Sequence, residues 1–142
     1  MFASKVFGDT LPTDRIVLTD MSGLNDRGFT FPNIDGTILV NIGAAYDDPI
    51  HYSLGKTYAT QGQLFIHELT HAWQIAHEWF IAGWICSALD AQIIQGQRAY
   101  NVGSPGPAYS DFGIEAQAVI VDRWFGKYAS GWQTMDDLDN KL

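Results

Sequence analysis

Residues 61–80, QGQLFIHELTHAWQIAHEWF, have the periodicity of a helix. On a helical wheel the apolar side chains between Leu64 and Phe80 form one broad face. The opposite stripe is polar and consists of Gln63, His67, His71, Gln74 and Glu78. The stretch therefore predicts an amphipathic helix whose polar stripe is either a solvated surface or a site with its own chemistry.

The segments around this helix predict a small α+β domain. The β-branched runs DRIVLT (14–19) and TILVNI (37–42) are bounded by turn formers and are typical of strands. Helical character extends from about 59 to 97, with a break near Gly83, and returns from 114 to about 127. A short N-terminal sheet followed by helices is the order of an α+β fold.

Composition limits the class of protein. A chain of 142 residues corresponds to one domain, 1–142. Its 8 Lys and Arg against 16 Asp and Glu give a net charge of -8, which argues against nucleic acid as a partner. No apolar run is long enough for membrane insertion or a Sec signal. The lone Cys86 excludes an internal disulfide, and its apolar neighbours predict a buried thiol.

The strongest chemical signal is the pattern from His67 through Glu68 to His71. The two histidines lie one helical turn apart, so both imidazoles can reach one Zn²⁺ at about 2.0–2.1 Å. The glutamate between them can reach a water at the metal and act as its base. Because Lys and Arg are missing from the polar stripe, a zinc site is favoured over a solvated helix face.

A catalytic zinc site normally has a third protein ligand, and the sequence offers two candidates. His77 has the spacing of the third metzincin histidine, but Gln74 stands where those proteins have a turning glycine. On a continuous helix His77 lies about 9 Å along the axis from His71 and about 120° around it, which is too far to share an ion. This geometry argues against His77.

Glu115 is the second candidate. On the predicted helix from 114 to about 127 it shares a face with Ala118, Val119 and Asp122. A lone carboxylate on an otherwise apolar helix is costly to bury unless it is paired or binds a metal, and Ala118 permits a close approach to the His helix. The alternative is a surface glutamate that the helix dipole favours in the first turn.

The segments FIHELTHAWQ (65–74) and DFGIEAQAVIVDRWF (111–125) resemble zincin-type metallopeptidase domains associated with VgrG spike proteins of bacterial type VI secretion. LTDMSGLNDRGFT and ILVNIGAAYDD are similar to that family more loosely, and together the four segments hold about a third of the 142 residues, spread between Leu18 and Phe125. The resemblance implies a zincin-like fold. It also implies that His67, His71 and Glu115 are the zinc ligands and that Glu68 is the catalytic base.

The resemblance further implies an antibacterial effector or toxin domain. Such a protein is made in the bacterial cytoplasm, is secreted, and acts in the periplasm of the target cell. Its expected partners are a peptide or protein substrate, a secretion spike protein and a cognate immunity protein. One departure concerns the aspartate that thermolysin-like enzymes carry four residues after the third ligand, because Val119 stands there. Asp122 or Asp111 could instead orient a zinc histidine.

The predicted activity is zinc-dependent hydrolysis of peptide or amide bonds. The oxyanion of such a reaction needs a further donor, for which Tyr109 is the first candidate, followed by Tyr100 and His51. The strand 38–42 either offers an edge to an extended peptide or is an ordinary internal strand. The alternative function is a non-catalytic zinc-stapled binding or adaptor module, which has no need for Glu68.

Overall fold

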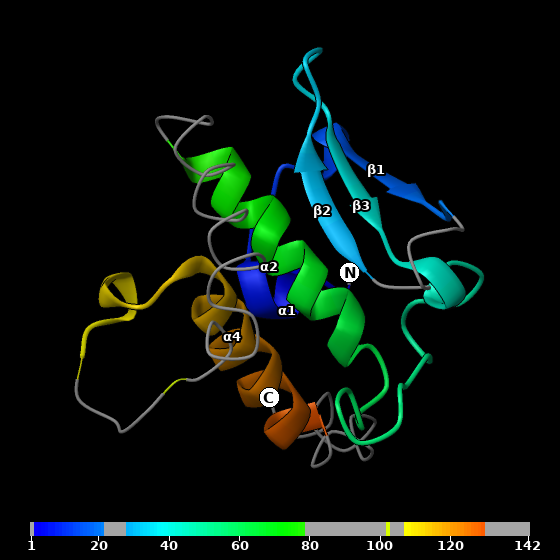
Figure 1. The fold of residues 1–142 in the computed structure, drawn as a ribbon, viewed down its shortest axis with the longest axis vertical. Helices are drawn as coiled ribbons and strands as arrows, with labels where there is room; N and C mark the ends of the chain where they lie inside the picture. Colours follow the sequence, from blue (N-terminus) through cyan, green and yellow to red (C-terminus); the bar gives the residue numbers. More distant parts are fainter. Residues whose placement is uncertain (1, 22–27, 79–101, 103–106, 130–142) are drawn as a thin grey trace, which may run out of the picture.

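The computed structural model describes residues 2–21, 28–78, 102 and 107–129. Its helices are α1 (Ser4–Phe7), α2 (Gln63–His77) and α4 (Ile114–Ala129). Its strands are β1 (Ile16–Thr19), β2 (Phe29–Pro32) and β3 (Ile38–Asn41). Helix α2 lies between the sheet and α4 (Figure 1). The predicted α+β class is therefore confirmed.

The sheet has the strand order β1-β3-β2, with β1 parallel and β2 antiparallel to β3. The strands predicted at 14–19 and 37–42 are confirmed as β1 and β3. Strand β2 was not predicted, because its four residues FTFP stand in a segment rich in turn formers. With β2 paired on one side and β1 on the other, β3 is the internal strand. The interpretation of 38–42 as a free edge is therefore wrong.

The apolar side chains of β3 lie on two different faces of the sheet. Ile38 and Val40 are fully buried and belong to the apolar core that packs against Leu69 and Ala72 of α2. Val17 and Phe31, which flank Leu39 in register on the other face of the sheet, are both partly exposed. One face of the sheet thus supports α2, as the period of two in a half-buried strand requires.

Helix α2 begins at Gln63, four residues later than predicted. Gly62 precedes it with a φ of 77°, and a Cβ at this position would stand 2.6 Å from the ring of Phe2. Glycine is therefore needed there for both the backbone conformation and the space. The helix ends at His77 because Glu78 has extended backbone angles. The predicted continuation towards 97, the break at Gly83 and Cys86 lie outside the described residues.

Four of the five residues predicted on the polar stripe are not solvated. Gln63, His67, His71 and Gln74 are all buried, since α4 covers this face of the helix, whereas Glu78 is exposed directly after the helix ends. The alternative of a solvated helix surface is therefore wrong.

Helix α4 confirms the helix predicted from 114 and extends it to Ala129. Its buried stripe of Glu115, Ala118, Val119 and Asp122 is the face that the sequence predicted. Ala118 is fully buried, which agrees with a close approach of α4 to α2. Among the described helices, none has the length and apolar character needed to cross a membrane.

Candidate metal centre

Three potential ligands meet between α2 and α4. The side chains of His67, His71 and Glu115 each offer one ligand atom, and these atoms lie within 4.8 Å of one another. All three side chains are buried, with Glu115 only 5% exposed. The ligand set predicted from the sequence is thus brought together, and it could bind a metal ion. The alternative of Glu115 as a surface residue is wrong.

The distances from the Glu115 carboxylate to the two imidazoles fit a shared metal better than direct hydrogen bonds. Glu115 Oε2 lies 3.6 Å from His67 Nε2 and 3.4 Å from His71 Nε2. Both distances exceed the roughly 2.7–3.2 Å of an N–H···O hydrogen bond. Two ligands bound tetrahedrally at about 2.0–2.1 Å from one zinc ion stand about 3.4 Å apart. The residues therefore fit a tetrahedral ion that they would share.

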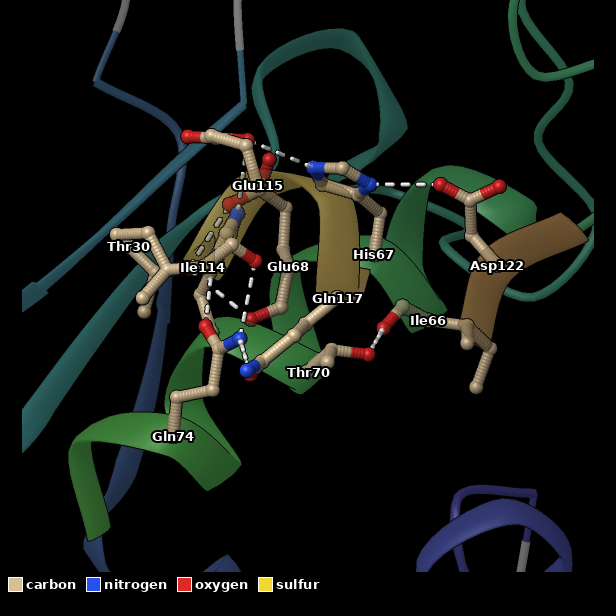
Figure 2. A network of polar contacts seen from close by, with 11 residues as sticks. Thr30, Ile66, His67, Glu68, Thr70, Gln74, Ile114, Glu115, Gln117 and Asp122 are labelled. Atoms are coloured by element: carbon tan, nitrogen blue, oxygen red, sulfur yellow. Dashed lines mark hydrogen bonds and ion pairs between the residues drawn. The ribbon is translucent and has the colours of Figure 1, made fainter. Parts of the chain in front are cut away.

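His67 is oriented from its far side by α4. Asp122 Oδ2 lies 2.7 Å from His67 Nδ1, and the ring stands between Glu115 and Asp122 (Figure 2). A carboxylate only accepts, so Nδ1 donates, which leaves Nε2 as the ring nitrogen that can bind a metal. Gln63 Nε2 donates to the other oxygen of Asp122 at 2.9 Å. Of the two aspartates considered for this role, the structure places Asp122 here.

Asp111 has a different position. It belongs to the 3-10 turn η5 (Tyr109–Asp111), where its Oδ2 accepts a hydrogen bond from the backbone N–H of Ala108 at 3.0 Å. This carboxylate closes the turn before α4 and leaves the orienting role to Asp122.

The carboxylate of Glu68 is held by strand β2. Glu68 is 4% exposed, and the Thr30 hydroxyl lies 2.8 Å from its Oε2 and 3.1 Å from its backbone carbonyl oxygen. A Cβ on Gly28 would stand 2.5 Å from Glu68 Oε1, so the backbone directly before β2 approaches the carboxylate closely. Sequence reasoning missed Thr30 and Gly28 because it missed β2. The only available signal was the alternation of Phe29 and Phe31 around Thr30.

Burial and charge act in opposite directions on these groups. Burial raises the pKa of Glu68, and the nearby imidazoles and Thr30 only partly offset it. Burial also opposes ionisation of Glu115, but the two histidines outweigh it and hold its pKa low. Desolvation likewise disfavours the cationic form of His67, but Asp122 and Glu115 raise its pKa to about 10. The carboxylates therefore attract a cation to this position.

A divalent cation would balance the charges of this site. Glu68, Glu115 and Asp122 are buried carboxylates, and the buried basic residues of α2 are His67 and His71 alone. Burying ionised groups without compensation is costly. A donor set of two imidazoles and one carboxylate is one that zinc accepts in catalytic sites.

Metal binding should depend on pH through His67. The metal needs the lone pair on Nε2, whereas the metal-free site with a pKa of about 10 keeps His67 protonated at neutral pH. Between pH 6 and 8 we expect zinc binding to release roughly one proton and apparent affinity to rise about tenfold per pH unit. Calorimetric titration in buffers of different ionisation enthalpy measures this release. Affinity that stays constant over this range would contradict the prediction.

The three candidates for the oxyanion donor lie in different parts of the chain. Tyr109 lies in η5, six residues before Glu115, with its side chain 39% exposed, and burial raises the pKa of its hydroxyl. Its role as a donor stays a prediction. His51 lies on the surface and pairs with Asp48 at 2.9 Å. Tyr100 lies outside the described residues.

Two other aromatic contacts define the surroundings of α2. His77 stacks on Trp73 with a centroid distance of 4.3 Å and donates to its backbone carbonyl, so it stands apart from the three clustered ligands. Tyr58 packs edge-on against the ring of His67 at a centroid distance of 5.5 Å. Sequence reasoning did not single out Tyr58, because nothing in its local pattern connects it with α2.

Comparison with known proteins finds no match to this chain among protein-family models, curated proteins or solved structures.

Proposed function

We propose that the protein is a zinc-dependent hydrolase of peptide or related amide bonds, with Zn²⁺ held by His67, His71 and Glu115. The observation that carries the proposal is the position of Glu68. This carboxylate is buried beside the three ligands and is hydrogen-bonded by Thr30 from a different element. A purely structural metal site has no use for an additional carboxylate that is not a ligand and whose burial is costly.

Each residue then has a defined task. Bound zinc would supply polarisation of the scissile carbonyl and a more acidic water. Glu68 takes the proton of the attacking water and delivers it to the leaving amine, for which a pKa raised above the ordinary glutamate value is suitable. Thr30 keeps the carboxylate of Glu68 in place, and Asp122 keeps the Nε2 atom of His67 directed at the ligand cluster.

The position of β2 supports an extended peptide as the substrate. Within the described sheet, β2 is an edge strand that pairs with β3 alone. Its Thr30 contacts Glu68, so a chain that added to this edge by main-chain hydrogen bonds would pass close to the base. This proposal moves the predicted peptide edge from β3 to β2.

We further propose the biological setting that the sequence resemblance implies. In it the protein is a type VI secretion effector domain that associates with a spike protein, acts in the periplasm of a competing bacterium and is neutralised by an immunity protein. The support is the resemblance of residues 65–74 and 111–125 to such domains, together with the buried ligand cluster that those residues form.

The competing function is a zinc-stapled binding or adaptor module. The observation in its favour is that the ligands come from two helices, so a metal would cross-link α2 and α4 whatever else it did. The two functions differ in whether bound metal leads to turnover.

Hydrolysis before and after metal removal tests the proposed function. Zinc-loaded protein should cleave members of a mixture of synthetic peptides, as read by mass spectrometry, because the metal is needed to activate the attacking water. Chelation should abolish cleavage, and one equivalent of Zn²⁺ should restore it. Protein that holds one zinc ion per chain and cleaves no peptide would support the adaptor module. Cleavage that survives chelation would contradict both functions.

A further inference from the structure

The outer nitrogens of the two histidine ligands have partners of different charge. His67 Nδ1 faces the carboxylate of Asp122, whereas His71 Nδ1 lies 2.8 Å from Oε1 of Gln74, a neutral amide. Gln74 is 6% exposed and lies one turn after His71 on the same helix. It is therefore a buried polar side chain whose three hydrogen-bonding partners can all be identified.

The orientation of the Gln74 amide is fixed by its other partners. Its Nε2 donates to the backbone carbonyl of Ile114 at 3.0 Å and to Oε1 of Gln117 at 2.9 Å (Figure 2). A backbone carbonyl can only accept, so the NH₂ group must face Ile114 and the oxygen must face His71. Rotating the amide by 180° would place two acceptors against each other.

Gln117 is fixed in the same way. Its Nε2 donates to the backbone carbonyls of Phe112 at 2.9 Å and Tyr109 at 3.3 Å, so its oxygen must face Gln74. The direction of every hydrogen bond between the turn before α4 and the ring of His71 is thus determined by backbone carbonyls. At the end of this series, His71 Nδ1 must be the donor, so Nε2, which lies 3.4 Å from Glu115 Oε2, is the ring nitrogen that can offer its lone pair to a metal.

We propose that Gln74 is a positioning residue for the metal. It selects the metal-binding tautomer of His71 and, through the carbonyl of Ile114, fixes that ring relative to the backbone that carries Glu115. The amide does this without adding a fourth carboxylate to Glu68, Glu115 and Asp122. The inference rests on the metal site of the proposed function and is independent of whether the protein hydrolyses peptides.

Binding of Co²⁺ tests this role, because its visible absorption reports on ligand geometry. The substitution Gln74→Met keeps the length of the side chain and removes all three hydrogen bonds. We expect it to weaken Co²⁺ affinity about 10- to 100-fold and to change the absorption bands of the bound ion. The matched control is Gln61→Met, an exposed residue just before α2, which should leave affinity and spectrum unchanged.

The outcomes separate this role from the metal site itself. A folded Gln74→Met protein with the affinity and spectrum of the wild type would overturn the role of Gln74 and leave the metal site standing. A wild-type protein that binds no Co²⁺ or Zn²⁺ would overturn both.

A measurement on the wild type keeps the inference testable if Gln74→Met fails to fold. The ¹⁵N NMR spectrum of the zinc-loaded protein should show His71 protonated at Nδ1, with a slowly exchanging proton that is hydrogen-bonded to the amide oxygen. An Nε2-protonated His71, or an Nδ1 proton in fast exchange with water, would overturn the inference.

Discussion

The substitution Glu68→Gln should abolish peptide hydrolysis and leave the bound zinc in place. Glutamine keeps the size of the side chain and a hydrogen bond with Thr30, but it cannot accept the proton of the attacking water. Loss of a general base lowers turnover by about 10²–10⁴-fold. His67, His71 and Glu115 are unchanged, so the metal should remain at one ion per chain.

This expectation is checked by measuring zinc content and peptide cleavage on the same preparations of wild type and variant. Glu78→Gln is the matched control, since Glu78 is exposed directly after α2 and should behave as the wild type. Unchanged turnover in Glu68→Gln would exclude Glu68 as the base. Loss of zinc from this variant would assign Glu68 to the ligand set instead.

The substitution Glu115→Ala should weaken zinc binding itself. It removes the anionic ligand, which is also the single ligand that α4 contributes. Only the two imidazoles on α2 remain. Because loss of a residue that merely orients a ligand costs about 10- to 100-fold in affinity, loss of a direct ligand should cost more than about 100-fold. Hydrolysis should disappear together with the metal.

Competition with a zinc chelator measures this change in affinity. Glu115→Gln is the informative companion, because it keeps the shape of the side chain and removes the charge, and it should bind zinc more weakly than the wild type. Glu78→Ala provides the surface control. Wild-type affinity in Glu115→Ala would show that the third ligand is another residue and would reopen the question of how the site is completed.

The sequence predicted those parts of the fold that have a strong local period. The β-branched runs of β1 and β3 and the helical repeat of α2 and α4 are visible without tertiary information. Strand β2 is different, because its four residues end in Pro32 and follow a turn-rich segment. It becomes a strand by pairing with β3 and by packing Thr30 against Glu68, and neither contact is encoded in its local pattern.

The metal site was predicted from the chemistry of its residue types more than from hydrophobic periodicity. Histidines one turn apart around a glutamate indicate a metal, and the lone carboxylate of Glu115 indicates its partner. Periodicity could not decide between a solvated stripe and a buried site, because this depends on α4 docking across α2. The role of Gln74 could not be predicted from periodicity either. In the sequence it is one residue of the polar stripe and the residue that argues against His77 as a ligand. Its contacts with His71 and Ile114 exist only in the folded protein.

The central claim, that one metal ion is shared by α2 and α4, is tested most directly by anomalous diffraction at the zinc edge from crystals of the zinc-loaded protein. We expect a single strong peak about 2.0–2.1 Å from Nε2 of His67, Nε2 of His71 and a carboxylate oxygen of Glu115. A peak that lies away from these three atoms, or the lack of any peak in crystals that contain the metal, would contradict the account.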